Sequence, residues 1–131
     1  MKYMIMFKTT NDAEGIPPCK DEAEMVSFIG KLAAEGVLLG TEGLYPSERG
    51  VRVSRAGGKV SALDGPFTEA KELVAGFVLV KVDSKDEAVD LAGRFLEVAG
   101  QGTAEVREVI ESPEDAVRYM AERFGAGAAT A

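Results

Sequence analysis

The chain has 131 residues, of which 46% are hydrophobic and 28% are charged, and its formal net charge is −7 at neutral pH. This length suits one domain with its own hydrophobic core, which we expect over residues 1–124, followed by a flexible tail at residues 125–131. An acidic surface is a poor match for nucleic acid or an anionic membrane, and no apolar run reaches the ~20 residues of a membrane span.

Two residue types that carry much of protein chemistry are scarce. Histidine is absent and Cys19 is the only cysteine. This composition excludes His-based acid–base pairs, nucleophile–histidine pairs, His-containing zinc sites and an internal disulfide. The carboxylates do not follow a calcium-loop spacing, so we expect neither a metal site nor a cofactor. The N-terminal segment has no signal-peptide cleavage site, which makes the cytoplasm the expected location.

The first third of the chain predicts a strand, a helix and a second strand. Residues 2–8 are apolar on both faces, which is typical of a strand covered on both sides. Asp21 and Glu24 form a capping-box-like start, and apolar residues then recur at helical spacing up to Gly36. Residues 37–45 follow as a second strand that contains two glycines.

The middle of the chain predicts a hairpin, a tight turn and another strand. Residues 51–55 and 59–63 flank a Gly-Gly pair, which indicates a β-hairpin. The Asp-Gly-Pro-Phe sequence at residues 64–67 predicts a sharp turn, because proline fixes its own φ and restricts the residue before it. Thr68 is placed to cap a short helical turn, and an apolar strand follows at residues 77–82.

The last third predicts a helix, a strand and a terminal helix. A capping box at Ser84 and a glycine at position 100 bound an amphipathic helix, and residues 103–110 form a further strand. Ser112 followed by proline and two acids is typical of a helix start. We expect the apolar stripe of this terminal helix to be buried through Val117, Met120 and Phe124.

Without the inserted hairpin and the extra C-terminal helix, the predicted order is βαββαβ. This is the ferredoxin-like α+β arrangement, in which two helices cover one face of an antiparallel sheet. Because residues 2–8 and 77–82 are apolar on both faces, the second face also needs a cover. A second copy of the chain is the simplest cover, and we predict a homodimer whose sheets pack face to face.

Several short stretches of sequence carry a family resemblance. They are Tyr3-Met4-Ile5, Thr41-Glu42-Gly43-Leu44, Asp64-Gly65-Pro66-Phe67, Glu69, Lys71-Glu72, Gly76-Phe77 and Glu105-Val106-Arg107. Over roughly residues 1–110 the chain resembles the DGPF branch of the YCII-related family, and the Asp-Gly-Pro-Phe stretch is the most specific part of the match. The resemblance implies a dimeric α+β barrel.

The resemblance implies less about function than about fold. Enzymes of the wider family are described as using a His–Asp pair, as in a dehydrochlorinase relative, and this chain has no histidine for that role. The DGPF branch is associated with extracytoplasmic-function sigma factors. The resemblance therefore implies a sensing or regulatory role rather than the acid–base mechanism.

Asp64 and Glu42 are the candidate catalytic residues. Asp64 lies between a strand and a turn, where its carboxylate is placed to bind a ligand hydroxyl or to act as a base. The alternative for Asp64 is an Asx-type cap of its own turn. Glu42 lies in a strand, and if it lies near Asp64 the two form a two-carboxylate site; the alternative is an exposed strand glutamate.

Four further residues are candidate ligand-binding residues together with Asp64 and Glu42. Tyr3 either lines a pocket with its hydroxyl or is a core tyrosine. Phe67 is an apolar anchor for a ligand or for the turn itself. Glu69 and Lys71 supply an acid and a cation to a ligand, or they are solvated surface charges.

Three functions fit these residues. The first is a dimeric small-molecule-binding domain with a pocket between the sheet and the helices near Asp64, which acts as a sensor or accessory protein. The second is an enzyme of the lyase or dehydrohalogenase type that uses Asp64 or Glu42 as its base. The third is a structural dimer that engages another protein. The absence of histidine favours the first over the second.

Overall fold

The computed structural model describes residues 1–10, 14 and 21–125. The expected tail, apart from its first residue, and Cys19 lie outside the described residues. A four-stranded antiparallel sheet forms the centre of the molecule, in the strand order β2-β5-β1-β6. These strands are β1 (Lys2–Thr9), β2 (Leu38–Gly43), β5 (Leu73–Lys81) and β6 (Thr103–Glu108).

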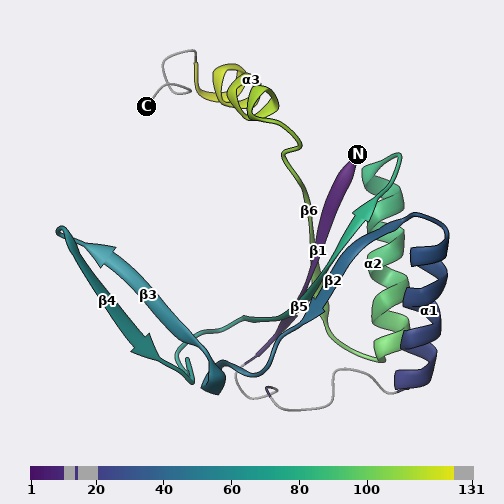
Figure 1. Cartoon of the computed structure of the whole chain (residues 1–131), viewed down its shortest axis with the longest axis horizontal. Coiled ribbons are helices and arrows are strands. Elements are labelled where there is room, and N and C mark those ends of the chain that lie inside the picture. Colours follow the sequence, from purple (N-terminus) through teal and green to yellow (C-terminus); the bar gives the residue numbers. More distant parts are fainter. Residues whose placement is uncertain (11–13, 15–20, 126–131) are drawn as a thin grey trace.

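Two helices cover one face of this sheet (Figure 1). They are α1 (Glu22–Ala34) and α2 (Lys85–Ala99). Each starts where the sequence predicts, because the Asp21 carboxylate accepts a hydrogen bond from the Glu24 amide at 3.0 Å and the Ser84 hydroxyl accepts one from the Glu87 amide at 3.1 Å. The predicted α+β class and ferredoxin-like βαββαβ order are confirmed.

The hydrophobic core fills the space between the sheet and these helices. Alternation along β1 turns Tyr3 and Ile5 toward the helices and leaves Met4 and Met6 on the opposite face. The largest fully buried side chains are Phe95, Ile5, Val78 and Val80. The helices therefore stabilise one face of the sheet, and we call the opposite face, with Met4, Met6, Phe77 and Leu79, the open face.

A hairpin inserted between β2 and β5 forms a separate two-stranded sheet. Its strands β3 (Val51–Ala56) and β4 (Lys59–Asp64) are joined by Gly57 and Gly58, whose φ angles of 60° and 76° suit a tight two-residue hairpin turn. The hairpin is confirmed with one more residue in each strand. A short 3₁₀ turn, η1 (Ser47–Arg49), precedes it.

The segment after the hairpin differs from the prediction. Residues 67–72 form no helical turn; the Ala70 amide donates to the Phe67 carbonyl at 3.1 Å and closes a single reverse turn. Strand β5 also begins at Leu73 and not at Phe77, so Gly76 lies within it. A Cβ on Gly76 would approach the Glu42 carbonyl oxygen to 2.8 Å, which means that this glycine allows β2 and β5 to lie close together.

The terminal helix α3 (Pro113–Phe124) starts as predicted, with the Ser112 hydroxyl accepting from the Asp115 amide at 3.1 Å. The prediction that its apolar stripe is buried is wrong. Val117, Met120 and Phe124 are 53%, 37% and 59% exposed. The reason is that the chain after β6 carries α3 away from the body of the protein, so its stripe packs against neither the sheet nor the other described helices (Figure 1).

The described helices are also short relative to a membrane. Among residues 21–125 none combines the length and apolar character needed to cross a bilayer.

Candidate functional site

A pocket of about 810 Å³ lies at the end of the sheet where β1 finishes and β5 begins. Its apolar wall comes from both helices and from the sheet, through Met25, Ile29, Phe95, Phe7 and Val78. The volume lies within the range typical of small-molecule sites, roughly 300–1,000 Å³. The pocket is therefore large enough for an apolar ligand of drug-like size.

Polar groups line the same pocket, and several of them are already engaged. The Thr41 hydroxyl donates to the Phe77 carbonyl oxygen at 2.9 Å. The two carboxylate oxygens of Glu14 accept from the amide and the hydroxyl of Ser47, both at 2.7 Å. These groups already have partners within the protein, so they fix the pocket wall and have less capacity left for a ligand.

Two lining carboxylates remain available. Glu42 on β2 and Glu72 just before β5 are exposed, and neither forms an ion pair or hydrogen bond with the residues that the structure describes. Lys8, which also lines the pocket, lies 3.6 Å from Glu105. The free charge at this pocket is thus negative, which suits a ligand with a hydrogen-bond-donating or cationic group.

A second pocket, of about 550 Å³, lies at the base of the hairpin and shares Glu72 with the first. Phe67 lines it, and the Arg52 guanidinium lies 4.1 Å from the centre of the Phe67 ring. Arg52 also pairs with Glu69 at 3.8 Å. Phe67 and Glu69 therefore hold Arg52 against the turn, a cation–π arrangement that joins the hairpin to residues 67–69.

The two candidate catalytic carboxylates do not share a pocket. Glu42 lines the larger pocket, whereas Asp64 lines neither and lies exposed opposite Val51 at the end of the hairpin. Among the described residues, no hydrogen bond joins the Asp64 side chain to its turn. The turn is instead held by the backbone, with the Gly65 amide donating to the Gly50 carbonyl at 2.9 Å.

The other candidates are spread over the molecule. Lys71 is exposed and lines neither pocket. Tyr3 is 4% exposed, belongs to the core and also lines neither pocket. Burial raises the pKa of the Tyr3 hydroxyl, and the nearby charge of Glu108 acts in the same direction. Of the six residues that the sequence brought forward, only Glu42 lines the larger pocket.

A comparison of the whole sequence places it among known proteins. The family model of the YCII-related domain matches residues 1–113. The chain belongs to the YCII-related domain family. An uncharacterised protein of Rhizobium meliloti (strain 1021) is 39% identical to it over 49 residues, which cover 37% of this chain and 40% of that protein. The matched stretch thus spans less than half of either chain.

The family match does not extend over the terminal helix. It ends at residue 113, the first residue of α3. The match therefore covers the sheet, the hairpin, α1 and α2, and nearly all of α3 lies beyond it.

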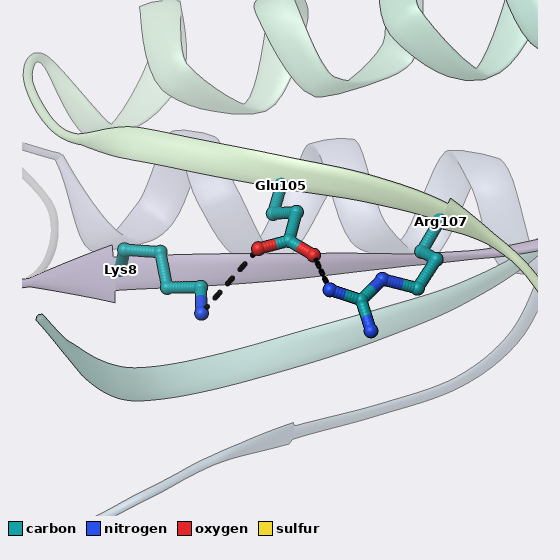
Figure 2. Close-up of polar contacts among 3 residues, drawn as sticks. All are labelled: Lys8, Glu105 and Arg107. Atoms are coloured by element: carbon teal, nitrogen blue, oxygen red, sulfur yellow. Dashed lines mark hydrogen bonds and ion pairs between the residues drawn. The ribbon is translucent and has the colours of Figure 1, made fainter.

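The open face of the YCII-related domain carries a row of charges. Figure 2 shows Glu105 on β6 between Lys8 on β1 and Arg107 on β6. The Arg107 guanidinium donates to the Glu105 carboxylate, and Lys8 lies 3.6 Å from it. The hydrogen bond from Arg107 lowers the pKa of Glu105, and the charge of Lys8 contributes in the same direction.

This row gives a prediction about pH. Because the pKa of Glu105 is lowered in the folded state, its ionised form stabilises the fold above the ordinary carboxyl pKa of about 4.3, and this stabilisation is lost as the pH falls through the folded-state pKa. Arg107→Gln is expected to raise the pKa of Glu105, as measured by NMR titration. Arg118→Gln, which disturbs only the pair with Asp115 on α3, is the control. An unchanged Glu105 pKa in Arg107→Gln would contradict the assignment.

Sequence reasoning did not identify the apolar wall of the pocket or Lys8 and Thr41. Ile29 and Phe95 follow the core-facing spacing of their helices, and this pattern does not distinguish a side chain at a pocket wall from one inside the core. The sequence feature that could have indicated the pocket is a pair of carboxylates near strand ends, Glu42 and Glu72. Within the described residues, no group of three or more acidic or sulfur-bearing side chains is arranged to hold a metal ion.

Proposed function

We propose that this YCII-related domain binds a small molecule in the pocket of about 810 Å³ and acts as a sensor or accessory protein. The observation that carries the proposal is a pocket at the end of the sheet whose apolar wall, on the helix side, is made by Met25, Ile29 and Phe95. Two lining carboxylates have no partner among the described residues, and one of them, Glu42, lies on the open-face side opposite Phe77. Pockets that bind small molecules have mostly apolar walls and a few polar groups that fix the orientation of the ligand.

The charges of the lining suggest the type of ligand. Lys8 pairs with Glu105, a carboxylate that it shares with Arg107, while Glu42 and Glu72 have no counter-ion among the described residues. A ligand with an apolar body on the helix side and a protonated amine or another donor group that extends past the end of the sheet would satisfy both parts of the pocket. Glu42 is the residue that we propose as the contact for this group.

The resemblance to the DGPF branch supports a regulatory role for the proposed ligand-binding domain. The turn at residues 64–67 is the feature that supports this branch, and a link to sigma-factor regulation is part of the proposed sensor role. In that role the pocket would report the presence of a metabolite to a partner protein.

We also infer that the domain is a homodimer. Met4, Met6, Phe77 and Leu79 give the open face an apolar centre that no described helix covers. Packing of two such faces, about 10 Å apart, is the ordinary way to bury them. Light scattering at micromolar concentration is expected to give the mass of two chains, and the mass of one chain would overturn the inference.

The ligand proposal is tested by a thermal-shift screen of small amines, phenols and carboxylic acids. A ligand that binds only the folded state raises its stability, by about 2.7 kcal/mol at a concentration of 100 Kd. We expect apolar amines to stabilise the wild type. Ile29→Trp, which fills the pocket, is expected to abolish the shift. Val26→Trp, on the same helix at a residue that is 71% exposed, is the matched control.

The two carboxylates are compared in the same screen. Glu42→Gln is expected to weaken the shift produced by amines, whereas Asp64→Asn is expected to leave it unchanged, because only Glu42 lines the pocket. A shift that survives Ile29→Trp, or the absence of any stabilising compound, would contradict binding at this pocket. Loss of the shift in Asp64→Asn alone would move the site to the turn.

A further inference from the structure

We propose that the hairpin and α3 are docking arms that pair with each other between two copies of this chain, so that the hairpin of one copy packs on α3 of its partner. This inference rests on the proposed homodimer and adds a specific interface to it. It assigns a role to the two elements that pack against neither the sheet nor the described helices in a single chain (Figure 1).

The hairpin has an apolar face that is largely exposed in its own chain. Cross-strand pairing puts Val53 opposite Ala62 and Arg55 opposite Val60, so the valines and Ala62 share one face together with Val51. Val51, Val53 and Val60 are 55%, 65% and 61% exposed. A two-stranded hairpin is only marginally stable in water and needs a surface to pack on.

Helix α3 has the same property. Val117, Met120 and Phe124 recur at helical spacing and form one apolar stripe. No residue of α3 is buried. Because isolated helices of this length are marginal in water, most helix stability comes from packing the apolar face. The apolar face of the hairpin and the apolar stripe of α3 therefore both lack a partner within one chain, and each could cover the other.

The positions of the arms explain why they do not meet within one chain. Figure 1 shows both on the side of the sheet away from α1 and α2, with the hairpin leaving one end of the strands and α3 the other. Consider a two-fold axis that lies between the open faces of two copies and runs perpendicular to their strands. Rotation about this axis makes the strands of the second copy run opposite to those of the first. It brings each hairpin to the end of the partner that carries α3 and covers all three apolar surfaces at once.

The net charges of the two arms are opposite in sign. The hairpin carries three basic residues and one acid, namely Arg52, Arg55, Lys59 and Asp64. Of these, Arg55 and Asp64 lie on the face of the valines, whereas Arg52 and Lys59 lie on the other face, where Arg52 pairs with Glu69. Helix α3 carries three acids and two basic residues, namely Glu114, Asp115, Glu122, Arg118 and Arg123. Two hairpins packed face to face about an axis along the strands would place Arg55 near Arg55 and Asp64 near Asp64 of the second copy, which disfavours that alternative.

Disulfide cross-linking tests this pairing directly. In a Cys19→Ala background, one tagged chain carries Val53→Cys and a second, co-expressed chain carries Met120→Cys. Because a disulfide requires Cα atoms within about 7 Å, oxidation links only residues that face each other. We expect a mixed disulfide dimer, and we repeat the experiment with Val51→Cys and Val60→Cys against Val117→Cys and Phe124→Cys to allow for the exact register.

A second measurement uses charge. Val53→Asp and Met120→Asp are each expected to weaken the dimer by about tenfold or more, because each places a carboxylate in an apolar contact. Val53 and Met120 are 65% and 37% exposed in the single chain, so the circular dichroism of both variants is expected to remain as in the wild type. Val26→Asp, on the outer surface of α1, is the matched control and is expected to leave the dimer intact.

The outcomes separate this inference from the dimer on which it rests. A monomeric wild type overturns both. A dimeric wild type that cross-links only between identical positions overturns the pairing of hairpin with α3. A dimeric wild type that forms no cross-link, and whose mass is unchanged by Val53→Asp and Met120→Asp, shows that the arms lie outside the interface. A mixed disulfide with weakened Asp variants supports the proposal.

Discussion

Replacing Phe95 with alanine is expected to lower the free energy of unfolding by about 3–5 kcal/mol, the largest effect of any single substitution considered for this protein. Phe95 is 2% exposed. Its ring lies edge-on to Phe28 at a centroid distance of 4.7 Å and tilted against Phe7 at 5.6 Å. Alanine would remove these aromatic contacts and leave a cavity that the surrounding side chains fill only in part.

The measurement is urea denaturation of wild type and Phe95→Ala followed by circular dichroism, with the slope on denaturant compared between the two. Val89→Ala is the control on the same helix, since Val89 is 50% exposed and alanine is the better helix former. We expect this control to stay within about 0.5 kcal/mol of the wild type. A loss below about 1 kcal/mol for Phe95→Ala would show that the packing around α2 is looser than the structure indicates.

Gly65→Ala is expected to cost about 1–3 kcal/mol, because a Cβ at this position has no room. The added methyl group would lie 1.7 Å from the Ser47 carbonyl oxygen and 3.3 Å from that of Gly50. Both atoms belong to the backbone, so the base of the hairpin has to move away from η1. The hydrogen bond from the Gly65 amide to the Gly50 carbonyl would be lost with that movement.

Hydrogen exchange measures this effect where it occurs. The amides of Gly50 and Gly65 donate to Ser47 and Gly50 carbonyls at 2.8 and 2.9 Å, and both are expected to lose protection in Gly65→Ala. Gly30→Ala is the matched control. Gly30 lies within α1 with nothing within 4 Å of the added Cβ, so this substitution is expected to stabilise the helix by about 0.5–1 kcal/mol. Unchanged exchange at Gly50 and Gly65 would contradict the proposed crowding.

The turn at residues 64–67 shows that the sequence explains only part of the reason for glycine at position 65. From the sequence, glycine suits this position because the proline that follows restricts its backbone and a turn needs a flexible residue. In the structure the stronger constraint on Gly65 is the carbonyl of Ser47, which approaches from a segment that is distant in sequence. A close approach of this kind leaves no local pattern, and only the folded chain reveals it.

The elements and their order were determined by the sequence itself. The caps at Asp21, Ser84 and Ser112, and the Gly57-Gly58 turn, each satisfy a backbone requirement within a few residues, so local sequence decides where helices start and where the hairpin reverses. Period-two and helical spacing decide which side chains face the core. The ferredoxin-like fold follows from these local rules.

The tertiary structure alone decided which of these residues act together. It placed Glu42 at the larger pocket and Asp64 away from it, and it left the stripe of α3 exposed although its pattern is that of a buried helix. The physical reason is that an amphipathic pattern indicates that an apolar surface must be buried, but does not indicate which element or chain buries it. The distance between two side chains far apart in sequence depends on the path of all the chain between them, and that path is fixed only when the whole domain packs.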